Sequence, residues 1–150
     1  MINGINSREM ILEILLEIEE GEHSHVAIRN ALSKYQFLPK QDRAFITRVC
    51  EGTLEYRIQI DYIINSFSKV TVDKMKPAIR EILRSAVYQL KYMDSVPDSA
   101  VCNEAVKLAQ RKGFYNLKPF VNGVLRTIAR EMDQVRFPQK EDDLLKYLSV

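Results

Sequence analysis

The sequence is poor in the residues that interrupt helices and in those that build metal or disulfide sites. It has five glycines, five prolines, two cysteines and two histidines among 150 residues. Cys50 and Cys102 lie far apart with no CxxC spacing, so we interpret them as reduced, packed thiols of a cytoplasmic protein. His23 and His25 supply half a metal site at best, and no acid or cysteine is spaced to complete it. We therefore predict no metal site.

Other absences exclude further classes. No apolar run approaches the ~18 residues of a membrane span, and the N-terminus MINGINSREM lacks the pattern of a secretory signal. The phosphate-binding motifs GxGxxG and GxxxxGK[ST] are both missing. Neither cysteine has a histidine within local reach that would activate it as a nucleophile. We therefore expect no catalytic residue, bound cofactor or membrane contact in this chain.

What the sequence does contain is apolar spacing with the period of an α-helix along nearly its whole length. The expected fold is all-α, a bundle of about seven helices, and 150 residues suit one domain with a substantial core. Asn6 and Gly21 fit the cap and stop of the first helix, Asp73 could cap the central one, and Gly113 fits a helix end. The expected helices are 7–20, 24–35, 39–56 continuing after a break to 67, 77–93, 97–112, 119–132 and a short acidic helix 141–148.

Two charge patterns stand out. Glu9, Glu13, Glu17 and Glu20 form one acidic face of the first helix, which we interpret as solvated or, alternatively, as a contact for a basic protein. Six basic residues and no acid occur between positions 105 and 130, although the net charge of the chain is only +2. A polyanion is the natural partner of such a block.

The basic block contains the candidate binding residues. Phe114 and Tyr115 lie in its central turn, and cations beside aromatic rings suit single-stranded or looped RNA; the alternative is a solvated basic face with Phe114 in the core. Asn103 is either a further candidate or a residue that caps or braces the turn after Pro97, and Gly123 is expected to permit close helix packing. The predicted RNA-binding residues are Lys107, Arg111, Lys112, Lys118, Asn122, Arg126 and Arg130.

These segments also carry a family resemblance. The strings VPDSAVCNEAVKLAQRKG and KPFVNGVLRTIAR resemble the NusB family of helical RNA-binding domains, as do QDRAFITRVCEGTLEYRIQIDYII and AIREILRSAVYQLKYMDSVP further upstream. The resemblance covers positions 7 to 130 and implies a NusB-like helical bundle that binds RNA. Within the family, the strings GTLEYR, LRTIAR and FPQKEDDLLKYLSV favour the N-terminal domain of the 16S ribosomal RNA cytosine-C5 methyltransferases (the RsmB, Sun or Fmu proteins).

The resemblance implies that RNA binding and methyl transfer belong to different parts of the protein. Residues 1–134 would form the RNA-binding domain, and residues 135–150 would begin the linker to a C-terminal methyltransferase module that uses S-adenosylmethionine. The expected partners are 16S ribosomal RNA and that module. No binding to DNA or to a membrane is expected. One alternative is a free-standing transcription antitermination factor, although helix one lacks the arginine-rich start of those proteins. Another alternative is a protein-interaction module that does not bind RNA.

Overall fold

The computed structural model describes residues 6–137, and every regular element in this range is helical. The expectation of an all-α bundle of about seven helices is confirmed. The α-helices are α1 (Ser7–Glu19), α2 (Ser24–Lys34), α3 (Lys40–Glu55), α4 (Arg57–Phe67), α5 (Pro77–Tyr92), α6 (Asp98–Arg111) and α7 (Lys118–Glu131). The expected helix at 141–148 lies outside the described residues.

Local signals in the sequence mark several helix ends. The Asn6 side chain accepts a hydrogen bond from the backbone N–H of Glu9 at 2.8 Å, which caps α1 as predicted. Gly21 and Gly113 follow α1 and α6 with φ angles of +116° and +88°, the left-handed conformation in which a glycine often ends a helix. A break at Tyr56 separates α3 from α4, also as predicted.

One predicted cap is wrong. Asp73 lies in a short 3-10 turn, Val72–Lys74, and α5 begins only at Pro77. The Asp73 carboxylate accepts a hydrogen bond from the Thr71 hydroxyl, so it supports this local turn. The residue before α5 is Lys76, whose side chain does not cap the helix, and Pro77 starts α5 with a φ angle suited to a first turn.

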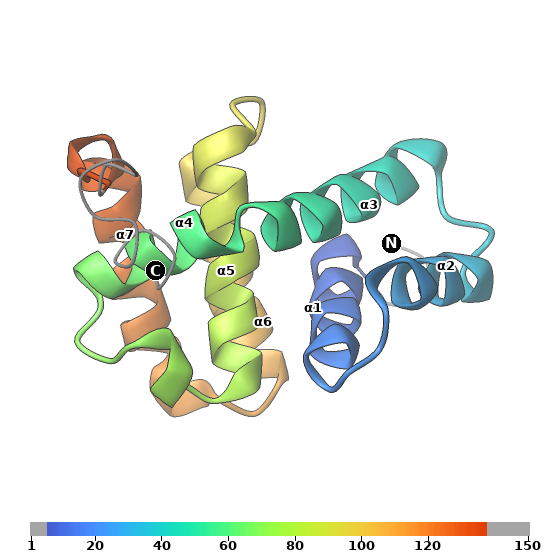
Figure 1. Ribbon diagram of the computed structural model, residues 1–150, viewed down its shortest axis with the longest axis horizontal. Helices are drawn as coiled ribbons and strands as arrows, with labels where there is room; N and C mark the ends of the chain where they lie inside the picture. Colours follow the sequence, from blue (N-terminus) through green and yellow to red (C-terminus); the bar gives the residue numbers. More distant parts are fainter. Residues whose placement is uncertain (1–5, 138–150) are drawn as a thin grey trace.

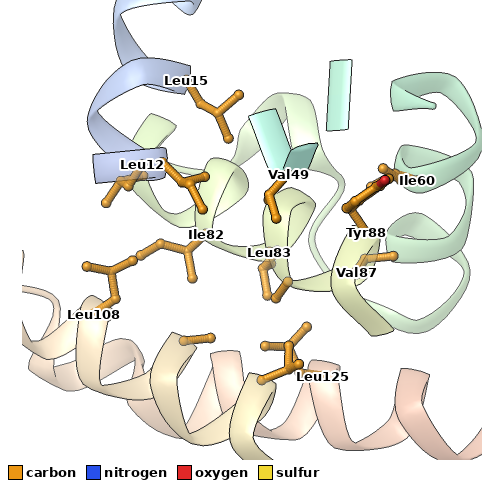
Figure 2. Packing of buried hydrophobic residues seen from close by; sticks show 14 of the residues in the cluster. Leu12, Leu15, Val49, Ile60, Ile82, Leu83, Val87, Tyr88, Leu108 and Leu125 are labelled. Carbon is orange, nitrogen blue, oxygen red and sulfur yellow. The ribbon is translucent and has the colours of Figure 1, made fainter. Parts of the chain in front are cut away.

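Helix α5 is the centre of the molecule. Figure 1 shows it between α1 and α2 on one side and α4 and α7 on the other, with α6 behind it. All ten residues from 81 to 90 are buried, and α5 contacts α1, α3, α4, α6 and α7. Leu12 of α1, Leu83 of α5 and Leu125 of α7 meet in the same apolar core (Figure 2). The prediction that 77–93 is the central helix is therefore confirmed.

A charged cluster is built into this core. The Arg84 guanidinium, 5% exposed, donates to both carboxylate oxygens of Asp61 on α4, at 2.8 and 2.9 Å, and to Glu81 at 2.6 Å. One turn earlier, Arg80 pairs with Glu19 at the end of α1. Arg80 and Arg84 are therefore both paired with carboxylates, and the cluster links α1 and α4 to α5.

A tight contact fixes the crossing of α3 and α5. The ring of Tyr88 lies directly against the backbone of Gly52, where an added Cβ would be 2.1 Å from Tyr88 Cε1. Tyr88 in turn packs beside Tyr56 and Tyr92, with ring centroids 6.5 and 5.2 Å away. Only glycine leaves room for this ring.

Within residues 6–137, no helix combines the length and the apolar character that a bilayer crossing requires.

Candidate nucleic-acid interface

Helices α6 and α7 form an antiparallel hairpin that carries most of the predicted binding residues. Gln110 near the end of α6 contacts Lys118 at the start of α7, and Asn103 near the start of α6 contacts Arg126 about two turns further along α7. We call the polar line between these contacts the α6–α7 seam, and α7 follows it for about 12 Å from Lys118 to Arg126. The seam consists of Asn103, Lys107 and Gln110 on α6 and Lys118, Asn122 and Arg126 on α7.

Arg126 is held in place by two amides. Its Nη2 donates to Asn103 Oδ1 at 2.7 Å, and its Nε donates to Asn122 Oδ1 at 3.1 Å. Both partners are neutral, and no ion pair within the described part of the chain involves Arg126. The guanidinium therefore keeps its full charge while its orientation is restrained, the arrangement that a phosphate-binding arginine needs.

Two further cations, Lys107 and Lys118, lie in the seam, and a third, Arg130, lies one turn beyond Arg126 on α7. The Lys118 ammonium donates to Gln110 Oε1 at 2.8 Å and lies 4.5 Å from the centre of the Tyr115 ring. Lys107 approaches Glu104 at 3.4 Å with its side chain 63% exposed, and Arg130 pairs with its neighbour Glu131 at 3.0 Å while 65% exposed. Ion pairs as exposed as these are weak, so a phosphate can compete for both cations.

The other two predicted cations point elsewhere. Lys112 lies 3.4 Å from Glu9 and 3.6 Å from Glu13, and Arg111 lies 3.8 Å from Glu9. The acidic face of α1 is therefore neither simply solvated nor reserved for another protein, because its first two carboxylates meet cations of the same chain. Sequence spacing within α1 could not show this, since it does not place α1 beside the end of α6.

Two interpretations of single residues are wrong. Asn103 does not brace the turn after Pro97, because its side chain reaches across the seam to Arg126. Gly123 does not serve close helix packing, because a Cβ added there would meet nothing within 4 Å. Gly123 faces open space on the outer side of α7, one position beyond Asn122. Phe114 packs against the core, as its alternative reading stated, whereas Tyr115 is 64% exposed.

Both cysteines are packed inside the protein, as predicted, and both histidines lie at its surface. Cys50 and Cys102 are buried, and burial raises the pKa of each thiol, which disfavours the thiolate that nucleophilic chemistry requires. His23 and His25 are exposed, with ring centroids 6.1 Å apart. Among residues 6–137, no three side chains of histidine, cysteine, aspartate or glutamate gather closely enough to hold a metal ion.

A second polar surface, a hollow of about 630 Å³ along α3, contains two arginines with structural roles. Arg43 donates to the backbone carbonyls of Leu32 and Tyr35 at the end of α2, at 2.9 and 3.2 Å. Arg48 donates to the carbonyl of Tyr92 at the end of α5, at 2.9 Å. These arginines satisfy helix C-termini, so they are less available to a ligand than the cations of the α6–α7 seam.

The seam lies within a region that matches known proteins. Over 83% of its length, the chain is 35% identical to a protein named probable ribosomal RNA small subunit methyltransferase B from Bacillus subtilis (strain 168), but it spans only 28% of that protein. Over 86% of its length, it is 33% identical to transcription antitermination protein NusB from Dictyoglomus thermophilum (strain ATCC 35947 / DSM 3960 / H-6-12), of which it covers 85%.

A solved structure and a family pattern agree with these relatives. The structure of T. maritima NusB superposes with a TM-score of 0.75 at 26% identity, covering 83% of this chain and 89% of that one. Residues 5–130 match the pattern that defines the NusB family, a range that includes α1 to α6 and nearly all of α7. Because this match extends over most of the sequence, the chain belongs to the NusB family.

Proposed function

We propose that this chain is an RNA-binding domain that recruits or orients 16S ribosomal RNA, in the cytoplasm, for a cytosine-C5 methyltransferase module of the same polypeptide. The observation that carries the RNA-binding part is Arg126, held by Asn103 and Asn122 with no carboxylate partner in the described part of the chain. Lys107, Lys118 and Arg130 extend the same positive surface. All of these residues stay predictions as RNA contacts, and α1 carboxylates compete for Arg111 and Lys112.

The ribosomal RNA target is supported by the relatives. The chain spans 28% and 29% of two ribosomal RNA small subunit methyltransferase B relatives, so the remainder of each has no counterpart in these 150 residues. Such a module would supply S-adenosylmethionine-dependent methyl transfer, while this domain would supply phosphate contacts. Within residues 6–137 both cysteines are buried thiols, so we assign no chemical step to this domain.

A free-standing antitermination factor is the alternative with specific support, because the NusB relatives match along most of their own length. One structural observation weighs against RNA binding through the start of α1. Arg8 donates to the buried Gln89 at 3.1 Å and lies 5.2 Å from the centre of the Phe45 ring, so it faces the protein. A methyltransferase module encoded in frame after Val150 would support our proposal, and a stop codon there would favour the alternative.

RNA binding is tested by titrating the 150-residue chain into a fluorescent helix-junction fragment of 16S ribosomal RNA at several salt concentrations. We expect affinity to fall steeply with salt, because bound cations displace counterions from phosphates. The double variant Arg126→Glu, Arg130→Glu should bind far more weakly. Its matched control, Arg29→Glu with Arg57→Glu on α2 and α4, makes the same charge change on other helices and should bind better than the seam variant.

The outcomes distinguish RNA binding through the seam, RNA binding governed by net charge alone, and no RNA binding. Equal losses in the two double variants would mean that net charge, and not the seam, governs binding. No binding at low salt would refute an RNA role and leave the protein-interaction module as the remaining reading. Circular dichroism of each variant confirms that a loss of affinity does not come from unfolding.

A further inference from the structure

One exposed aromatic ring lies at the end of the α6–α7 seam. Tyr115 is the first residue of a 3-10 turn, Tyr115–Leu117, that joins α6 to α7, and it is 64% exposed. Its neighbour Phe114 points the other way and packs against the core. The turn therefore places one aromatic ring against the core and the other at the surface, and Tyr115 is not among the residues that pack against the core within positions 6–137.

A cation is fixed over one face of this ring. The Lys118 ammonium lies 4.5 Å from the ring centre and is also hydrogen-bonded to Gln110 at 2.8 Å. This cation–π contact and the amide together restrain Lys118 before any ligand arrives. Because most of Tyr115 is exposed, the ring still has surface for a second planar group. A ligand suited to this place combines a flat aromatic group with negative charge beside it.

An unpaired nucleotide has both features, so we propose that Tyr115 is a stacking platform for an unpaired RNA base, with Lys118 and Arg126 holding the phosphates beside it. This inference rests on the proposed RNA-binding function and adds a preference: the seam selects RNA with unpaired nucleotides over continuous duplex. Inside an A-form duplex each base is already stacked between its neighbours, and no base face is available to a tyrosine.

The size of the preference follows from stacking energetics. Stacking of one base on an aromatic side chain corresponds to roughly 5- to 150-fold in affinity, by conversion of the free-energy cost of alanine substitution. The Tyr115 hydroxyl is not needed for stacking, so a phenylalanine should serve as well. Phosphate contacts, in contrast, are common to paired and unpaired RNA, and Arg126 should therefore contribute to the binding of both.

The test uses two RNAs of equal length and charge, one a hairpin with an unpaired loop and one a continuous duplex, each carrying 2-aminopurine. We expect Tyr115→Ala to weaken hairpin binding roughly 5- to 150-fold and to leave duplex binding nearly unchanged. Tyr115→Phe should keep wild-type affinity. Loop 2-aminopurine fluorescence should be quenched on binding to the wild type and Tyr115→Phe, and not on binding to Tyr115→Ala.

A second exposed aromatic provides the matched control. Phe37 is 52% exposed and lies between α2 and α3, so Phe37→Ala should bind both RNAs like the wild type. The stacking inference is overturned if Tyr115→Ala binds the hairpin with normal affinity, or if it loses affinity for both RNAs by the same factor. In that case, weaker binding of both RNAs by Arg126→Glu would still identify the seam as the binding site. If the wild type binds neither RNA, the proposed function fails and the inference with it.

Discussion

Arg84 holds Asp61 through two parallel hydrogen bonds, Nε to Oδ1 at 2.8 Å and Nη2 to Oδ2 at 2.9 Å. The pair joins α5 to α4 inside the core, where the side chains of Arg84 and Asp61 are 6% and 13% exposed. Removing the cation would leave the carboxylates of Asp61 and Glu81 without their main partner. A charge left uncompensated at a buried site destabilises a fold far more than the loss of a surface pair.

We therefore predict that Arg84→Met lowers the free energy of unfolding by about 3–5 kcal/mol. The control is Arg130→Met, which removes an exposed arginine paired with Glu131 and should cost about 0–1 kcal/mol. Urea denaturation followed by circular dichroism measures both values. A similar, small cost for the two variants would contradict a structural role for the core cluster.

The same cluster predicts a pH dependence of stability. Burial and a hydrogen bond with Glu19 raise the pKa of Glu81 from 4.5 to about 8 despite the attraction of Arg84. The pKa of Glu19 moves the opposite way: burial would raise it, but hydrogen bonds with Arg80 and Glu81 and the charges of Arg80 and Arg84 together lower it. Three carboxylates meet only two guanidinium groups here, so a proton on Glu81 removes the excess negative charge.

Between pH 4.5 and about 8 the folded protein retains a proton on Glu81 that the unfolded chain has released. This group therefore stabilises the fold fully below pH 4.5, and its contribution declines as the pH rises toward 8, by at most about 1.4 kcal/mol per pH unit. Glu81→Gln, which resembles the protonated acid, should remove that decline. Urea denaturation at pH 5, 6.5 and 8 measures the free energy of unfolding of both proteins. Parallel pH profiles for the variant and the wild type would rule out this role of Glu81.

Gly52 and Gly123 predict opposite effects of the same substitution. Gly52→Ala would place a Cβ 2.1 Å from the Tyr88 ring, and we expect the forced shift to cost about 1–3 kcal/mol. Gly123→Ala adds a methyl group in open space within α7, so improved helix propensity should stabilise the protein by about 0.5–1 kcal/mol. Thermal melts of both variants give the comparison. Destabilisation by Gly123→Ala would show that the outer side of α7 is more constrained than the structure indicates.

These glycines also show how far the sequence predicts the structure. Apolar periodicity identified the helices because burial of one helix face dominates their stability, and Asn6 and Gly113 marked ends through local hydrogen bonds. The roles of Gly52 and Gly123 depend on which helix crosses them, and no local pattern contains that information. Asp73 failed as a cap for a different reason, because it lies in a separate short turn and α5 begins only at Pro77.

The candidate site shows the same limit: patterns along one helix were predictable, and contacts between helices were not. The basic block between positions 105 and 130 was visible in the sequence, and spacing along single helices placed Asn122 one turn before Arg126. Contacts between helices were not visible. The pairing of Asn103 with Arg126 and that of Lys112 with Glu9 both require knowing that α6 lies between α7 and α1. The charge at each position was therefore predictable, and the competition between carboxylates and other ligands for each cation was not.

That competition leads to a last prediction. Glu9 and Glu13 lie 3.4 to 3.8 Å from Lys112 and Arg111 and occupy cations that could otherwise contact phosphate. The double variant Glu9→Gln, Glu13→Gln should bind RNA more tightly than the wild type. Its salt dependence should also steepen, by roughly 0.7–0.9 in the slope of log K against log salt for each freed cation that contacts a phosphate.

The control is Glu17→Gln with Glu20→Gln, which removes the same charge from the same helix at two exposed positions further along the acidic row. A matching gain in the control would attribute the effect to net charge alone, because both variants raise it equally. An unchanged salt slope in the first variant would place Arg111 and Lys112 outside the RNA footprint. The footprint would then be confined to the seam around Arg126, which bound RNA could reach without approaching α1.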